Sequence, residues 1–138
     1  MLAGELNVVV DVSSYINDQK PQQPTGTATW DMNLFGAITG TASADCTYAW
    51  EDLGGGNARI FGGYKTDDGS GNKIIGKYNA IKQGYRAGVL VSSTFSVDSG
   101  RKLYKNITDN GQPGTLNGTY DAAGMPTDMT FYCPNVTY

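Results

Sequence analysis

Histidine is absent from this 138-residue chain, and charged residues make up only 17% of it. Without histidine, the chain cannot build Ser-His-Asp or Cys-His catalysis or a histidine-ligated metal centre. Lys and Arg number 10 against 13 Asp and Glu, which gives a formal charge of −3. Because no basic excess is present to neutralise phosphates, the composition predicts no nucleic-acid binding.

Cysteine is also scarce, and the two that occur, Cys46 and Cys133, are too few for a disulfide scaffold. Both fall on apolar faces of predicted strands. Three states stay open: a bridge between them, two free buried thiols, or one thiol at an interface. We favour two free buried thiols because no signal peptide is evident.

The first residues, Met1 to Glu5, contain neither the basic nor the apolar segment of a signal peptide. If Met1 is native, the protein is made in a cytoplasm; if Met1 is a cloning start, the mature protein could be secreted. The longest nearly uncharged apolar stretch, residues 87–97, is interrupted by serines and is far too short to span a membrane. We therefore expect no membrane partner.

Alternation of apolar and polar side chains is the dominant pattern that is present. Leu6, Val8, Val10 and Val12 share one face of a segment, and Ala28, Trp30, Met32 and Leu34 share one face of another. This period of two predicts strands with one buried face and one wet face. No segment keeps a helical period for three turns, and the weak helical candidates, residues 12–17 and 79–84, are short.

About nine short strands separated by turn signals are predicted in all, and nothing marks a domain linker. They cover residues 6–12, 28–34, 46–53, 59–64, 73–81, 85–97, 102–107, 115–120 and 127–133. The predicted turns are residues 54–57, 67–72, 98–100 and 109–111, and residues 18–25 are a predicted connector. Gly62 and Gly63 predict a bulge or a close backbone approach.

The spacing of these strands is typical of one all-β domain over residues 1–138, with little or no helix. We predict an antiparallel β-sandwich of Greek-key or jelly-roll type, with a partly closed barrel as the alternative. Residues 85–97 are uncharged on both faces beyond Arg86, which favours a central strand covered on both sides.

The segment 67–72, which contains Asp67 and Asp68, offers oxygen ligands that Ca²⁺ could use. The two acids are adjacent, however, and the twelfth residue from Asp67 is Tyr78 rather than a glutamate. The EF-hand pattern is therefore not matched, and a solvated hairpin turn is the favoured interpretation.

Glu51 and Asp52 lie beside Trp50 and resemble the paired carboxylates that glycosidases need. Adjacent residues of a strand point to opposite faces, so these two form no such pair unless the chain turns there. The favoured interpretation is a charged strand end before a glycine turn. The glycine-rich segments 54–56 (Gly-Gly-Gly) and 69–71 (Gly-Ser-Gly) lack the Lys-Ser/Thr of a phosphate loop.

Nine tyrosines and two tryptophans could form a stacking platform for sugars. Trp30, Tyr48, Trp50 and Tyr78 fall on the same faces as apolar neighbours, which favours core or subunit-interface positions. Asn106, Asn117 and Asn135 match the glycosylation pattern, which matters only in a eukaryotic secretory route.

No catalytic, cofactor-binding or metal-ligating residue is assigned, and no cofactor is expected. The leading hypothesis is a non-enzymatic assembly protein, such as a bacteriophage capsid-decoration, capsid or tail protein, whose partners are its own copies or other particle subunits. Residues 6–12 are the predicted edge strand for that contact. The alternative is an extracellular carbohydrate-binding, adhesin or pilin-like module, and an enzyme is the least favoured hypothesis.

Overall fold

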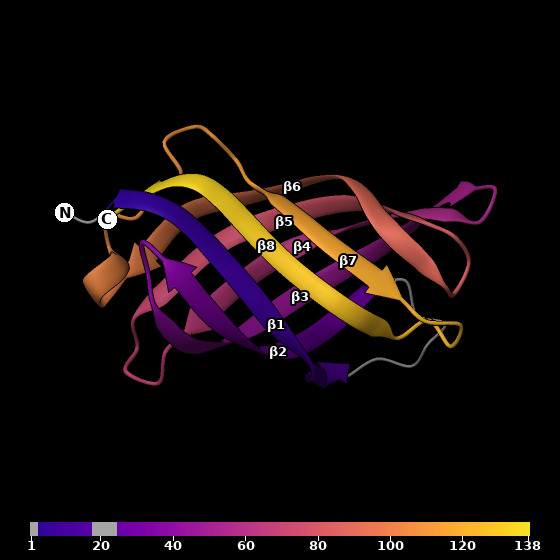
Figure 1. Ribbon diagram of the computed structural model, residues 1–138, viewed down its shortest axis with the longest axis horizontal. Coiled ribbons are helices and arrows are strands. Elements are labelled where there is room, and N and C mark those ends of the chain that lie inside the picture. The colour runs from indigo at the N-terminus through magenta and orange to yellow at the C-terminus, as the bar shows by residue number, and fades with distance from the viewer. Residues whose placement is uncertain (1–2, 18–24) are drawn as a thin grey trace.

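The computed structural model describes residues 3–17 and 25–138 as a closed antiparallel barrel (Figure 1). Its eight strands are β1 (Ala3–Asn17), β2 (Thr25–Gly36), β3 (Gly40–Gly54), β4 (Asn57–Asp67), β5 (Lys73–Gln83), β6 (Gly88–Arg101), β7 (Thr115–Tyr120) and β8 (Pro126–Thr137). Each strand pairs with the next along the chain, and β8 returns to pair with β1. The prediction of an all-β antiparallel fold with little helix is confirmed.

The predicted sandwich is corrected to a barrel, because β1 and β8 pair from Ala3↔Thr137 to Val9↔Thr130. Alternation specifies one buried face, and that face can be covered by a second sheet or by the same sheet curling round on itself. In this chain the sheet, with strands up to 15 residues long, closes on itself. Residues 6–9 are hydrogen-bonded to β2 and β8 and so have no free edge.

The predicted alternation is confirmed in the first strands. Leu6, Val8 and Val10 of β1 are 2–5% exposed and point into the barrel. Met32 and Leu34 of β2 are equally buried, whereas Asn33 between them is exposed. The predicted connector 18–25 lies outside the described residues except for Thr25, which begins β2.

The predicted strand 85–97 is wrong in its start and in its surroundings. Tyr85 lies in the loop before β6 and is 78% exposed. Leu90 points inward, while Val89 is 45% exposed on the outer surface. A register shift against β5, with Ser92 at φ 50°, restores inward positions for Phe95. The strand belongs to a single-layer wall and is therefore covered on one side only.

The turn predicted at 98–100 and the strand predicted at 102–107 are also wrong. Strand β6 continues to Arg101 and is followed by a short 3-10 helix, η1 (Lys102–Tyr104). The Asp109 carboxylate accepts the backbone N–H groups of Val97 and Gly111, both at 3.0 Å, and holds the following loop against β6. The weak helical segments 12–17 and 79–84 lie in β1 and, up to Gln83, in β5.

Strands β6 and β7 share little backbone ladder, namely Gly88↔Tyr120, Val89↔Thr119 and an isolated bridge at Phe95↔Gly114. Between these contacts the Ser93 hydroxyl replaces the missing backbone bonds. It donates to the Leu116 carbonyl at 2.7 Å and accepts the Leu116 N–H at 2.9 Å. The Ser93 side chain thus helps to join β6 and β7, the neighbouring strands with the fewest paired backbone positions.

The two ends of the barrel differ. At the end where β1 starts and β8 stops, η1 and its following loop bring Tyr104 and Ile107 into the main apolar cluster, together with Ile38 from the β2–β3 turn (Figure 1). This end is plugged. The loops β3–β4, β5–β6 and β7–β8 lie at the other end. The part of the chain that the structure describes contains no helix with the length and hydrophobicity of a membrane span.

Candidate functional site

A cavity of about 1080 Å³ occupies the barrel interior and reaches the end opposite the plug. Its inward-facing wall residues include Leu6, Val8, Ala28, Trp30, Met32, Ala44, Tyr48, Trp50, Ile60, Tyr78, Ala80, Leu90, Phe95, Leu116, Met129 and Phe131. All of these side chains are apolar or aromatic, and the polar residues that also line the cavity include Thr66, Lys82 and Asp52. A shallower hollow of about 590 Å³ lies near Ala3 and Tyr138 at the plugged end.

Small and large side chains both contribute to the wall of the cavity. Three of the lining residues, Ala28, Ala44 and Ala80, are small and only 0–4% exposed. Aromatic residues form the deep wall: the rings of Tyr64 and Phe95 stack at 4.9 Å, and those of Phe95 and Phe131 stack at 5.1 Å. Stacked rings are rigid and bury a large apolar area, so the deep part of the cavity wall is rigid.

The rim of the cavity is built from loops. Gly54 to Asn57 of the β3–β4 turn, Gly84 to Arg86 and Ala123 to Pro126 all line it. The turn predicted at 54–57 is confirmed, with Gly54, Gly55 and Gly56 at φ 64–80°. These positive values favour glycine, since other residues rarely adopt them.

Lys82 lies on the inward face of β5, just below this rim, and is only 5% exposed. Its Nζ donates to the carbonyl oxygens of Gly84 at 3.0 Å and Arg86 at 2.6 Å. The same atom lies 4.9 Å from the centre of the Tyr120 ring and 6.0 Å from that of Trp50. The ammonium group is therefore held by two carbonyls and two aromatic faces.

No carboxylate of the described chain forms an ion pair with Lys82. Burial lowers the pKa of the Lys82 amine, because a desolvated ammonium loses its hydration. Asp52 is the only acidic residue among the described wall residues of the cavity. Asp52 lies on β3 and Lys82 on β5, and Ala58 of β4 is paired with both and separates them. The Asp52 Oδ1 accepts the Gly54 N–H at 2.8 Å.

The four aromatics considered for a sugar platform, Trp30, Tyr48, Trp50 and Tyr78, all line the interior cavity. The prediction that they share a face with apolar residues is confirmed. They form no flat patch on the outer surface. Trp30 packs against both apolar clusters of the barrel, whereas Trp50, near the rim, is 37% exposed.

Glu51 and Asp52 do not form the carboxylate pair that was considered for a glycosidase-like site, in agreement with the favoured interpretation. Glu51 points outward and lies 3.7 Å from Arg59, whereas Asp52 points to the cavity rim. The prediction that these neighbours occupy opposite faces is confirmed. Asp31 and Asp45 face outward, where they accept the hydroxyls of Ser43 at 2.7 Å and Thr29 at 3.5 Å.

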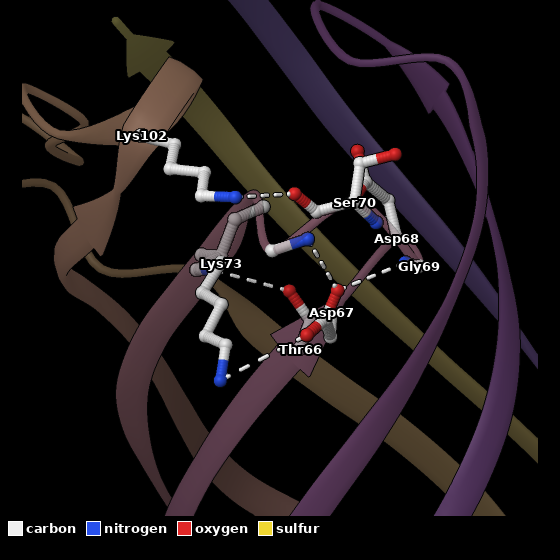
Figure 2. A network of polar contacts seen from close by, with 9 residues as sticks. Thr66, Asp67, Asp68, Gly69, Ser70, Lys73 and Lys102 are labelled. Atoms are coloured by element: carbon white, nitrogen blue, oxygen red, sulfur yellow. Dashed lines mark hydrogen bonds and ion pairs between the residues drawn. The ribbon is translucent and has the colours of Figure 1, made fainter.

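The Asp67–Asp68 segment is a hairpin tip between β4 and β5, as predicted (Figure 2). Asp67 Oδ1 accepts the N–H groups of Gly69 at 2.8 Å and Gly71 at 3.0 Å, which lowers the pKa of Asp67. Asp68 accepts the Ser70 N–H at 2.8 Å. Over the described residues, no three His, Cys, Asp or Glu side chains cluster in a way that could hold a metal ion.

Cys46 and Cys133 are both buried free thiols, which confirms the favoured state. Cys46 lines the cavity, and burial, aided by the charge of Asp45, raises its pKa to about 12. Burial also raises the pKa of Cys133, which is 0% exposed. Only the thiolate is a nucleophile, so both groups are inert at neutral pH.

Sequence reasoning missed Lys82, although the alternation that places it was present. In β5 the even-numbered positions Ile74, Tyr78 and Ala80 point inward, and Lys82 is the next even position. A charged residue at an inward position of a strand is the signal that could have identified it.

Comparison with protein-family models, with curated proteins and with solved structures finds no match for this chain.

Proposed function

We propose that this protein binds a small, mainly apolar molecule inside its barrel. The observation that carries the proposal is the cavity of about 1080 Å³, open at one end and plugged at the other. Pockets for small molecules occupy roughly 300–1000 Å³ and are mostly apolar, with a few placed polar groups. An eight-stranded barrel is wide enough to hold one such ligand.

The lining of the cavity supports an apolar ligand. Trp30, Tyr48 and Tyr78 present aromatic surface to the interior, and a ligand that covers them removes that surface from water. Protein interiors are normally close-packed, so an unfilled apolar space forfeits dispersion contacts that a ligand would restore.

The chemistry of the lining favours binding over catalysis. Asp52 and Lys82 are separated by the Ala58 strand position and form no ion pair. The Cys46 thiol, with a pKa of about 12, stays protonated at neutral pH. Enzymes that use an acid together with a base place both within reach of the same reacting atoms, and the separation of Asp52 from Lys82 therefore supports our inference of a non-enzymatic function.

A fluorescent apolar probe tests the proposal. N-Phenyl-1-naphthylamine is neutral and brightens when it leaves water, and we expect it to bind the wild-type protein at one site. Ala58→Trp places a large ring at the rim, because Ala58 is half-buried, points inward and stands opposite Lys82. We expect this variant to weaken probe binding about tenfold or more.

The matched control is Ala49→Trp, since Ala49 is also half-buried in a strand but does not line the cavity. This variant should bind the probe like wild type. A folded Ala58→Trp protein that binds as well as Ala49→Trp would place the probe outside the barrel and refute the proposal. Absence of any saturable binding to wild type would do the same.

The assembly function stays a separate proposal. It is supported by apolar side chains on the outer surface, among which Phe35 is 50% exposed and Phe61 is 39% exposed. Pairing of β1 on both sides along residues 6–9 favours contact through faces rather than through that strand edge. Light scattering on the purified protein tests it, and a monomer at all concentrations would contradict self-assembly. Location in a virion or outside the cell stays a prediction.

A further inference from the structure

We infer that the ligand of the cavity is an amphipathic monoanion, a carboxylate on an apolar body, and that Lys82 binds its charged end. The inference rests on the proposed function and specifies the chemical class of ligand. It is carried by Lys82, the one buried cation among the described residues, which lies near the rim of a mainly apolar cavity.

The hydrogen-bonding capacity of Lys82 gives the first argument. An ammonium group has three donors, and two of them go to the carbonyl oxygens of Gly84 and Arg86. Among the described residues, the third donor has no hydrogen-bond acceptor. A ligand oxygen in the cavity would complete the set.

The charge of Lys82 gives the second argument. A buried ammonium is costly unless an opposite charge compensates it. The two carbonyls and the Tyr120 ring, 4.9 Å away, offset part of that cost. The described chain supplies no carboxylate partner within 4.0 Å, so an anionic ligand would provide the missing charge.

Position within the cavity gives the third argument. Lys82 lies at the rim beside Gly84 and Arg86, whereas the stacked rings of Phe95 and Phe131 lie deeper. A ligand with its carboxylate at Lys82 would therefore extend its apolar body toward those rings. Arg86 also lines the rim, so two cations stand there against the single carboxylate of Asp52.

Decanoate, decan-1-ol and decyltrimethylammonium share one chain and differ in the charge at its end. Each is titrated against bound N-phenyl-1-naphthylamine at neutral pH. A charge-assisted hydrogen bond in a desolvated site corresponds to a preference of about 10- to 100-fold. We expect decanoate to displace the probe at concentrations lower by that factor than decan-1-ol, and the cation to displace it least.

Two substitutions on β5 assign the preference to one residue. Lys82→Met should abolish the preference for decanoate while the neutral probe still binds. Lys77→Met removes an exposed, outward lysine of the same strand and should leave the preference unchanged. Lys82→Arg keeps the charge and should keep most of the preference. Lys82→Gln gives the neutral comparison if the Met variant does not fold.

The outcomes separate the two proposals. If wild type binds the neutral probe but decan-1-ol competes as well as decanoate, the anion inference is overturned and the cavity proposal stands. The inference also fails if folded Lys82→Met keeps the preference. If neither the probe nor any competitor binds, the proposed function itself is wrong.

Discussion

The hydroxyl of Tyr64 crosses over Gly76, the residue directly opposite it on β5, and donates to the Ser96 carbonyl of β6 at 2.6 Å. Tyr78 and Gly62 form the reverse arrangement two pairs along the same ladder, in which the Tyr78 hydroxyl donates to the Thr47 carbonyl of β3 at 2.7 Å. Each tyrosine thus lies across a glycine and ties its own strand to the next but one. These two hydrogen bonds connect the four strands β3 to β6 within one curved wall.

Gly76→Ala tests this arrangement. A Cβ at Gly76 would lie 1.9 Å from the Ser96 carbonyl oxygen and 2.5 Å from the Tyr64 hydroxyl. We expect a loss of about 1–3 kcal/mol or more in the free energy of unfolding, as for overpacking of a core, measured by urea denaturation. Gly63→Ala is the control, because a Cβ there meets no atom closer than 3.5 Å. Equal losses in the two variants would contradict the close approach.

Tyr64→Phe should destabilise the protein by about 1 kcal/mol at neutral pH through loss of the bond to Ser96. Burial, followed by the charge of Asp98, raises the pKa of Tyr64 well above 10.0. Above pH 10 the unfolded chain loses this proton and the folded chain keeps it, so wild-type stability falls as the pH rises. The advantage of wild type over Tyr64→Phe should therefore shrink above pH 10, which urea denaturation at pH 7 and above pH 10 measures. A constant advantage would mean that Tyr64 titrates normally in the folded protein.

Lys82→Met should change the pH dependence of stability in the opposite sense. Burial lowers the pKa of Lys82 below 10.5. Between the lowered value and 10.5 the unfolded chain binds the proton and the folded chain does not, so this residue makes stability rise with pH. The stability of wild type relative to Lys82→Met should therefore increase as the pH rises toward 10.5.

Lys77→Met is the control for that measurement, since Lys77 is exposed on the same strand. Its stability relative to wild type should stay constant over the same pH range. Asp52 and Arg86, the charged groups that share the rim with Lys82, are present in all three proteins. A flat difference between wild type and Lys82→Met would show that Lys82 is solvated.

The thiols provide a test of the interior. Because the pKa of Cys46 is about 12 and Cys133 is 0% exposed, we expect iodoacetamide at neutral pH to leave both cysteines of the folded protein unmodified. Both should react once the chain is unfolded in urea, and mass spectrometry counts the groups added. Rapid modification of the folded protein would mean that the cavity opens widely to reagents.

Much of the fold was predictable from local patterns. Alternation identified the inward faces of β1 and β2, and the glycine and aspartate turns at 54–57 and 67–72 were located correctly. The predictions were wrong where the structure depends on contacts between residues that are not neighbours in the sequence. Asp109 draws the loop after η1 onto Val97, and the register shift near Ser92 changes which residues of β6 face inward. Neither effect has a signature in the local sequence.

The sequence by itself determined which side chains leave water: the period of two places Trp30, Tyr48, Tyr78 and Lys82 on inward faces, since neighbouring residues of a strand point to opposite sides. Only the tertiary structure decided what those faces enclose. Pairing of β1 with β8 joins residues more than 120 positions apart, and local periodicity carries no information about such a contact. Closure turns the inner face of a sheet into the wall of a cavity and brings one lysine to its rim.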